Sequence, residues 1–398
     1  MMLITQATLY ADSLSPEEAV SIALQRNLLL AASSSRITAA QGSRRQAGLR
    51  PNPRLFLQSE NTRFGGATPF HYPRDADNFA YLSQVFETAG KRDRRIELAS
   101  QDIQSNELAL SGYRLQLTGS VLASYWAAVT AQGLEAALAE GVQNLERTVQ
   151  YNSDRVREGS LPESDLIRIQ LEYGQVALSY QNARQDSRRL VSSLFREMGV
   201  PEQQAVTLSG KLEAVPSFSL SDVDRALERR PDVAMARQAL EQARSNMRLQ
   251  RANSVPDPEV LFGYKRTAGF NTLIAGVQVN LPFHNRNQGA IAAATANETG
   301  AVAALEGTRM AARTEVAALK AEYEQKQRIV NELLPKMRDQ SAETIRIADA
   351  VYREGASDLL RLLDAQKTRL QTEALYIHSL SDYRQAALNL QIALGMLP

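Results

Sequence analysis

The stretch VYREGASDLLRLLDAQ at residues 351–366 has a near copy earlier in the chain, VREGSLPESDLIRIQ at residues 156–170. Both contain Arg-Glu-Gly, a few small residues and Ser-Asp-Leu, and their glycines, Gly159 and Gly355, lie 196 positions apart. Long segments with apolar residues at helical spacing stand before and after each phrase. We therefore interpret both phrases as turns, each joining two long helices into a hairpin.

The similarity at this offset extends upstream of the helices. RPNPRLFLQSE at 50–60 matches VPDPEVLFGYK at 255–265, and SQVFETAGKRDRR at 83–95 matches VQVNLPFHNRNQG at 277–289. The chain is thus predicted to be a tandem duplication, with units too long for the repeats of a solenoid protein.

The duplication predicts two structural repeats, at residues 13–198 and 233–398, joined by a proline-rich segment at 199–232. Each repeat is expected to contain a helix, two strands and a helical hairpin. The expected strands lie at about 54–62, 78–87, 259–267 and 272–281, and the expected hairpin tips lie at 157–165 and 353–364.

Composition excludes several classes of function. The 45 Lys and Arg residues nearly balance the 44 Asp and Glu residues, so net charge predicts no nucleic-acid partner. The absence of Cys excludes thiol chemistry, disulfides and Cys-ligated zinc. No run approaches the roughly 18 apolar residues of a transmembrane helix. The start, MMLITQATLYADSLSPEEA, has neither a basic segment nor a long apolar run, so we expect any export signal to be missing or trimmed.

The predicted helices are very long. Residues 91–157 contain no proline, and apolar residues recur about every 3.5 positions, as at Leu138, Val142, Leu145 and Val149. This spacing is typical of helices that supercoil against neighbours. At about 1.5 Å per residue such a helix is roughly 100 Å long, which exceeds the diameter of a compact domain.

The second repeat is predicted to contain the same pair of helices, at about 287–353 and 357–394. Pro335 lies inside the first of them and should kink or locally break it, because proline lacks an amide hydrogen and clashes with the preceding turn.

The segments between the helices alternate with a period of two. In TLIAGVQVNLPF, apolar Leu273, Val277 and Val279 alternate with Gly276 and Gln278. Strands of about nine or ten residues with one apolar face are those of transmembrane barrels. A soluble hairpin packed on a helix is the alternative, but four such strands, paired by the duplication, favour the barrel.

Four strands are too few to close a barrel, since the smallest membrane barrels have about eight. Open strand edges are not tolerated in lipid. Several copies of the chain must therefore combine their strands, and we expect an oligomer. The first hairpin loop, at about 63–77, is the longer one and suits an external position.

With these hairpins, paired strands and the LLDAQ phrase, the chain resembles the TolC-type outer membrane factors of Gram-negative bacteria, from SLSPEEAVSIALQRN at 13–27 to the terminal ALGM. SQVFETAGKRDRR is most similar to the outer membrane components of heavy-metal efflux systems, the CzcC and CusC type. The resemblance implies a mainly α fold with a small β part. It further implies a homotrimer with one 12-stranded β-barrel in the outer membrane and a helical barrel across the periplasm.

The resemblance also implies a function. The chain would be the passive exit duct of a tripartite efflux system, embedded in outer membrane lipid, with a periplasmic adaptor and an inner-membrane pump of the resistance-nodulation-division type as partners. Heavy-metal cations are the implied cargo. A channel for drug efflux or type I protein secretion shares every feature of the fold, and a soluble coiled-coil scaffold is a more remote alternative.

The two turns are then expected at the periplasmic end, where the gate and the adaptor lie. The implied docking residues are Glu158, Gly159, Ser160, Leu161, Glu354, Gly355 and Ala356. The implied pore-gate residues are Asp364, Arg361, Asp358, Asp165 and Glu163. Three copies of the aspartate in LLDAQ would line a constriction, and an arginine at one position of the family's acidic pair allows ion pairs between subunits.

The residues themselves also permit a simpler interpretation of these acids. Carboxylates in the first turn of a helix complement the helix dipole, and Ser164 or Ser357 could cap the helices that follow the turns.

A basic run follows the second strand, with Lys91, Arg92, Arg94 and Arg95. Because it comes after a membrane-type strand, we interpret it as a collar at the level of lipid headgroups and not as a nucleic-acid patch.

No enzyme is predicted. His71, His284 and His378 lie far apart, with no second histidine at ligand spacing, and the methionines are scattered. The sequence contains no nucleophile elbow, phosphate-binding loop or zinc-protease motif. We therefore expect no catalytic residue, no metal site and no cofactor.

Overall fold

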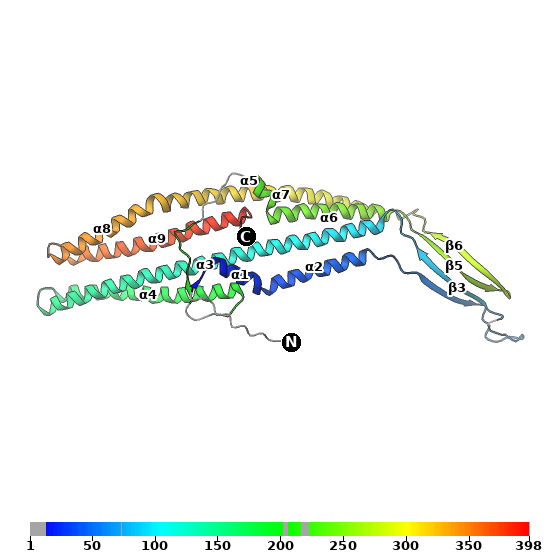
Figure 1. Cartoon of the computed structure of the whole chain (residues 1–398), viewed down its shortest axis with the longest axis horizontal. Helices are drawn as coiled ribbons and strands as arrows, with labels where there is room; N and C mark the ends of the chain where they lie inside the picture. Colours follow the sequence, from blue (N-terminus) through cyan, green and yellow to red (C-terminus); the bar gives the residue numbers. More distant parts are fainter. Residues whose placement is uncertain (1–12, 73, 202–205, 216–222, 398) are drawn as a thin grey trace. The chain divides into compact units, whose positions relative to one another are not determined.

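A computed structural model describes residues 13–72, 74–201, 206–215 and 223–397 of the chain (Figure 1). Parts of the expected joining segment, 202–205 and 216–222, lie outside the described residues. The elements in the first half are β1 (Ser13–Leu14), α1 (Pro16–Arg26), α2 (Leu28–Ala47), β2 (Arg54–Glu60), β3 (Asp77–Val85), α3 (Lys91–Arg157), α4 (Glu163–Met198) and β4 (Thr207–Leu208). Those in the second half are α5 (Val223–Arg229), α6 (Pro231–Asn253), β5 (Pro258–Thr267), β6 (Phe270–Val279), α7 (Gln288–Arg328), the π-helical turn η1 (Ile329–Leu333), α8 (Leu334–Arg353) and α9 (Leu359–Ala393).

The order of elements repeats once along the chain. A helix, two strands and a long helical hairpin follow one another in α2–β2–β3–α3–α4 and again in α6–β5–β6–α7–α8–α9. Internal contacts, however, group the described residues differently. One compact unit contains the described parts of 1–31, 111–230 and 309–398, and the other contains 32–110 and 231–308. Each unit takes residues from both halves of the chain.

The second unit contains a four-stranded antiparallel sheet in the order β2-β3-β5-β6, in which β3, β5 and β6 are neighbours (Figure 1). All four expected strands lie within two residues of their predicted bounds, and the one expected at about 272–281 spans Phe270–Val279. It begins at Phe270 because a two-residue turn at Ala268 and Gly269, both with positive φ (51° and 81°), joins it to β5, and this is the tightest way to join two antiparallel strands.

The long helices begin and end close to their predicted bounds. Helix α3 has 67 residues and no break. In the second half the helix is interrupted by η1, and Pro335 follows as the second residue of α8. Because proline cannot donate the hydrogen bond of the regular helix, the turn before it widens. The predicted local break at Pro335 is confirmed.

The core of the first unit holds the described part of the joining segment against the helices. The hydroxyl of Tyr125, a fully buried residue of α3, accepts a hydrogen bond from the Gly210 amide at 2.9 Å. A Cβ at Gly210 would lie 2.7–2.9 Å from the rings of Tyr125 and Trp126. The Arg384 guanidinium lies 3.6 Å from the centroid of the Trp126 ring and donates to the carbonyl oxygens of Lys211 and Leu212.

None of the helices in the described parts of the chain is long and apolar enough to cross a membrane.

Candidate functional site at the helical hairpin tips

Both hairpin tips end their first helix in the same way. Gly159 has φ 75° and Gly355 has φ 73°, so both adopt the left-handed conformation, which glycine takes without steric penalty. The Gly159 and Ser160 amides donate to the carbonyl oxygens of Val156 and Arg155, at 3.0 and 2.8 Å.

The second tip repeats this pattern. The Gly355 and Ala356 amides donate to the carbonyl oxygens of Tyr352 and Val351, at 3.1 and 3.0 Å. Such paired bonds satisfy carbonyl groups that would otherwise have no partner at a helix end. The predicted tight turns are therefore confirmed at both tips.

The glycines are required by backbone conformation and not by packing. A Cβ built on Gly159 or on Gly355 meets no atom within 4 Å. The expected docking residues around them are exposed, except that Leu161 is half-buried. Each tip thus presents a rigid turn to solvent, with a glutamate before its glycine.

The carboxylates after the tips have different local roles. Asp358 is the N-cap of α9, and its Oδ1 accepts a hydrogen bond from the Arg361 amide at 3.0 Å. Helix α4 starts after Pro162 with no side-chain cap. The expectation that Ser164 or Ser357 caps these helices is therefore wrong.

Asp364 and Arg361 lie on the exposed side of α9, one turn apart. Leu362 and Leu363, between them, are buried in a cluster with Leu145, Ile169, Tyr352 and Leu359. Within the described residues neither charged side chain forms an ion pair, and no hydrogen bond joins the gate residues of the two tips. The structure thus leaves the Asp364 carboxylate free to face another chain or the solvent.

A buried polar contact behind the tips was not expected. The Tyr352 hydroxyl of α8 donates to Asn152 Oδ1 of α3 at 2.5 Å, and Asn152 is fully buried. Asn152 Nδ2 in turn donates to the Thr148 carbonyl oxygen at 2.8 Å. We call the Tyr352–Asn152 contact the latch, because it ties the two hairpins of the chain together.

Arg155 completes the surroundings of the latch. Its Nη1 donates to the Tyr352 hydroxyl at 3.3 Å, and its guanidinium lies 5.6 Å from the Tyr352 ring centroid and 5.8 Å from that of Tyr151. Burial raises the pKa of the Tyr352 hydroxyl, although Arg155 acts in the opposite direction. The signal in the sequence was Asn152 itself, a polar residue in an otherwise apolar helical stripe.

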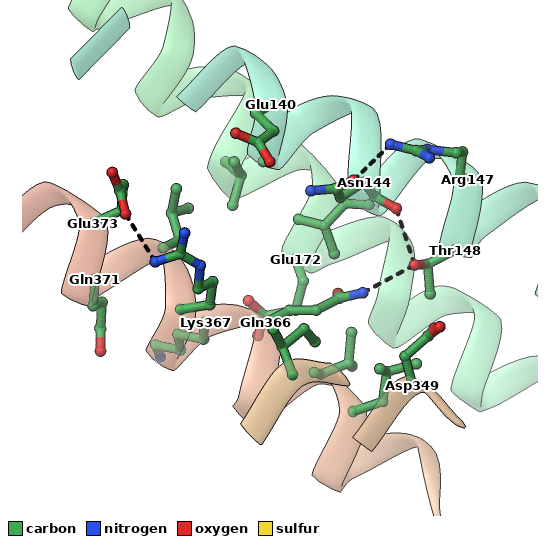
Figure 2. A pocket seen from close by; sticks show the side chains of 18 of the residues that line it. Glu140, Asn144, Arg147, Thr148, Glu172, Asp349, Gln366, Lys367, Gln371 and Glu373 are labelled. Atoms are coloured by element: carbon green, nitrogen blue, oxygen red, sulfur yellow. Dashed lines mark hydrogen bonds and ion pairs between the residues drawn. The ribbon is translucent and has the colours of Figure 1, made fainter. Parts of the chain in front are cut away.

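A cavity of about 680 Å³ lies next to the latch, between α3, α4, α8 and α9 (Figure 2). One hydrogen bond joins α9 to α3 across it, from Gln366 Nε2 to Thr148 Oγ1 at 3.1 Å, and Arg147 donates to Asn144 Oδ1 along α3 at 2.7 Å. Carboxylates from all four helices lie around it: Glu140 of α3, Glu172 of α4, Asp349 of α8 and Glu373 of α9 (Figure 2). The cavity thus separates the hairpins on one side of the latch, and both polar and apolar side chains line it.

The basic run after β3 makes contacts within the chain. Lys91 is buried, and its Nζ lies 2.7 Å from Asp257 Oδ2 and donates to the Val255 carbonyl oxygen at 2.6 Å. Arg95 is paired with Glu87. The expected headgroup collar therefore needs correction: Lys91 holds the corner between strand and helix, and burial removes it from any lipid surface.

The other two members of the run are exposed. Arg92 Nε donates to the Gly48 carbonyl oxygen at 2.6 Å, and Arg94 lies 3.0 Å from Glu97. Both guanidinium groups remain accessible to solvent.

The histidines are not brought together. His71 lies in the loop between β2 and β3, His284 follows β6, and His378 belongs to α9. Across the described ranges, no group of three or more His, Cys, Asp or Glu residues is arranged to hold a metal ion.

Comparison with known proteins agrees with these features. The chain is 26% identical, over 97% of its length and 91% of the relative's, to the cobalt-zinc-cadmium resistance protein CzcC of Cupriavidus metallidurans. Its fold is similar to that of CusC, with a TM-score of 0.80, 18% identity and coverage of 95% and 91% of the two chains. The outer membrane protein VceC of Vibrio cholerae gives a TM-score of 0.76, with 20% identity and 96% coverage of both chains.

A family match covers most of the chain and falls on both halves. The family described as outer membrane efflux protein matches residues 19–200 and again residues 223–396. The chain belongs to the outer membrane efflux protein family.

Proposed function

We propose that the protein is the outer membrane exit duct of a tripartite efflux system and conducts its cargo passively. The four-stranded sheet is the main support for this proposal. Its outer strands β2 and β6 each have one edge without a partner in the described chain, and one of its faces is apolar and exposed. Leu273 is 73% exposed, Leu57 69% and Phe262 60%. Such a surface is stable in lipid only if the edges are paired with other copies.

The assembly follows from the number of strands. Four strands per chain need at least two chains for the smallest membrane barrel. We infer three chains: CusC, which has a similar fold, forms a transmembrane channel, and three chains of four strands give the 12-stranded barrel that the resemblance to the TolC-type factors implies. In this assembly the hairpin loops of the sheet face outward and the long helices continue into the periplasm.

The tips supply the gate and the docking surface. In this proposal the exposed residues around Gly159 and Gly355 contact a periplasmic adaptor, which links the duct to an inner-membrane pump. Three copies of Asp364 and Arg361 surround the narrowest point, with Asp358, Asp165 and Glu163 as further lining. The latch keeps the second hairpin against the first, so it favours the closed form.

Heavy-metal cations are the proposed cargo. The support is the likeness to the cobalt-zinc-cadmium resistance protein, which extends over nearly the whole chain. The cargo needs no binding site of its own, since a passive duct has only to let it pass.

Deletion of the gene in its host tests the proposal. We expect the deletion strain to become sensitive to one or more of zinc, cobalt, cadmium, copper and silver, and a plasmid copy to restore resistance. Sensitivity to antibiotics alone would replace the metal cargo with drugs. Absence of the protein from the outer membrane fraction would contradict the duct and favour a soluble scaffold.

A further inference from the structure

The two faces of the sheet differ in chemistry. Residues directly opposite each other in an antiparallel sheet share a face. Leu55, Leu82, Phe262 and Ala275 form one such row on the apolar face. Gln58, Phe79, Lys265 and Thr272 form a row on the opposite face, which we call the polar face.

Lys265 has a defined position on the polar face. Its Nζ lies 5.3 Å from the centroid of the Phe79 ring on the neighbouring strand, within the range of a cation–π contact. It forms no ion pair with any carboxylate of the described chain, and its side chain is half-buried. The ring therefore holds the ammonium group against the sheet without neutralising its charge.

The other charges of this face have polar partners nearby. Arg54 and Glu259 form an ion pair at 2.5 Å. Glu60 accepts from Gln58 Nε2 at 2.5 Å. Asp77, opposite Glu60, accepts hydrogen bonds from Asn61 and from the Ala268 amide.

The balance of charge on this face depends on Lys265. The face carries two cations and three carboxylates in the strands, a net charge of −1 per chain. Without the Lys265 charge it would be −2 per chain, and three chains would change from −3 to −6. Since Arg54 is paired, Lys265 is the cation whose field acts on passing ions.

We propose that Lys265 is a charge-selectivity residue of the pore, where it lowers the passage of small inorganic cations relative to anions. This inference rests on the proposed function, in which the apolar face meets lipid and the polar face lines the pore. Three Lys265 side chains then surround the pore one row inside the carboxylates of Glu60 and Asp77, near the external end.

Ion permeability ratios in planar bilayers test the charge. The measurement is the reversal potential of the purified full-length protein across a potassium chloride gradient, at about 0.1 M, where screening acts over roughly 10 Å. We expect Lys265→Gln to raise the cation-to-anion permeability ratio about twofold, because three positive charges are removed at about one screening length from the passing ions. Lys265→Glu changes the charge twice as much and should raise the ratio about fourfold.

Arg266→Gln is the matched control. Arg266 is the next residue of the same strand and lies on the opposite face, in a row with Asn78 and Asn271. Its neutralisation removes the same charge from the lipid side, so we expect the permeability ratio of this variant to stay at the parent value. Native mass spectrometry confirms that each variant keeps the oligomeric state of the parent.

The absence of Cys permits a second, independent measurement. Lys265→Cys should react with a charged, water-soluble thiosulfonate in the inserted protein. Leu273→Cys, on the apolar face, should be protected from that reagent and react with a lipid-soluble maleimide.

The outcomes separate the two proposals. If the parent protein forms no conducting pore, the proposed function fails. If it conducts, but Lys265→Gln and Lys265→Glu select ions as the parent does, the role of Lys265 is refuted and the duct stands. Protection of Lys265→Cys from the water-soluble reagent in a conducting pore also refutes it.

Discussion

Removal of the Tyr352 hydroxyl should loosen the resting gate. In Tyr352→Phe the ring stays, but the 2.5 Å hydrogen bond to Asn152 is lost, and the oxygen of a fully buried amide is left without that donor. A buried polar atom without a partner costs about 1–3 kcal/mol. If the latch opens with the gate, this penalty falls on the closed form alone. A change of about 1–2 kcal/mol raises the ratio of open to closed channels roughly 5–30-fold.

Single-channel recording in planar bilayers measures this ratio, and thermal unfolding measures stability in parallel. Tyr383→Phe is a matched control, because the Tyr383 hydroxyl is also buried and bonds to Tyr323 at 3.2 Å, away from the tips. It should lower the melting temperature without changing the open fraction. Replacing both latch partners, with Tyr352→Phe and Asn152→Leu, should recover much of the stability and keep the raised open fraction.

The latch should also be insensitive to pH over the physiological range. Burial raises the pKa of the Tyr352 hydroxyl above its ordinary value, so the folded chain holds this proton more tightly than the unfolded chain. The contribution of the protonated hydroxyl is then fully present below about pH 10 and lost only as the pH rises through the raised pKa. One outcome would refute the role of the latch in gating. If Tyr352→Phe and Tyr383→Phe show the same open fraction as the parent while both lose stability, the Tyr352–Asn152 contact stabilises the fold but does not hold the gate closed.

Three further predictions concern the tips and the corner between strand and helix. Gly355→Val should abolish metal resistance but keep the trimer, because a side chain at φ 73° is strained by at least about 1–2 kcal/mol even though the space around it is free. The control Gly300→Ala, within a helix, should remain active. Loss of membrane insertion in Gly355→Val would show that the glycine is needed for folding and not for docking. Asp364→Ala should raise single-channel conductance or weaken cation selectivity, since it removes a ring of three carboxylates, and a channel identical to the parent would place the gate elsewhere. Lys91→Met should lower the free energy of unfolding by roughly 2–3 kcal/mol, less than for a fully buried pair because its carboxylate partner remains 23% exposed. Arg92→Gln, at an exposed site, should change the free energy of unfolding by less than about 0.5 kcal/mol in the same denaturant titration. Equal effects of the two substitutions would show that the buried Lys91–Asp257 pair contributes no more to stability than an exposed residue does.

The apolar period of the helices, the alternation of the strands and the two glycine turns are local properties, and the sequence by itself determined them. A 3.5-residue spacing defines one face of a helix wherever the helix lies. A glycine that ends a helix adopts the left-handed conformation for steric reasons that involve only its neighbours. Hence the 67-residue helix α3, the break near Pro335 and the turns at Gly159 and Gly355 agree with the predictions.

The partners of polar side chains were decided by the tertiary structure. Asn152 and Tyr352 are 200 residues apart, and Lys91 and Asp257 are 166 apart, so no local pattern shows that they meet. The sequence predicted Lys91 at the level of lipid headgroups because it follows a membrane-type strand, and lysine is in general seldom buried. Only the folded chain supplies the carboxylate and the carbonyl oxygen that make its burial possible, since a buried charge is tolerated when it is paired and hydrogen-bonded.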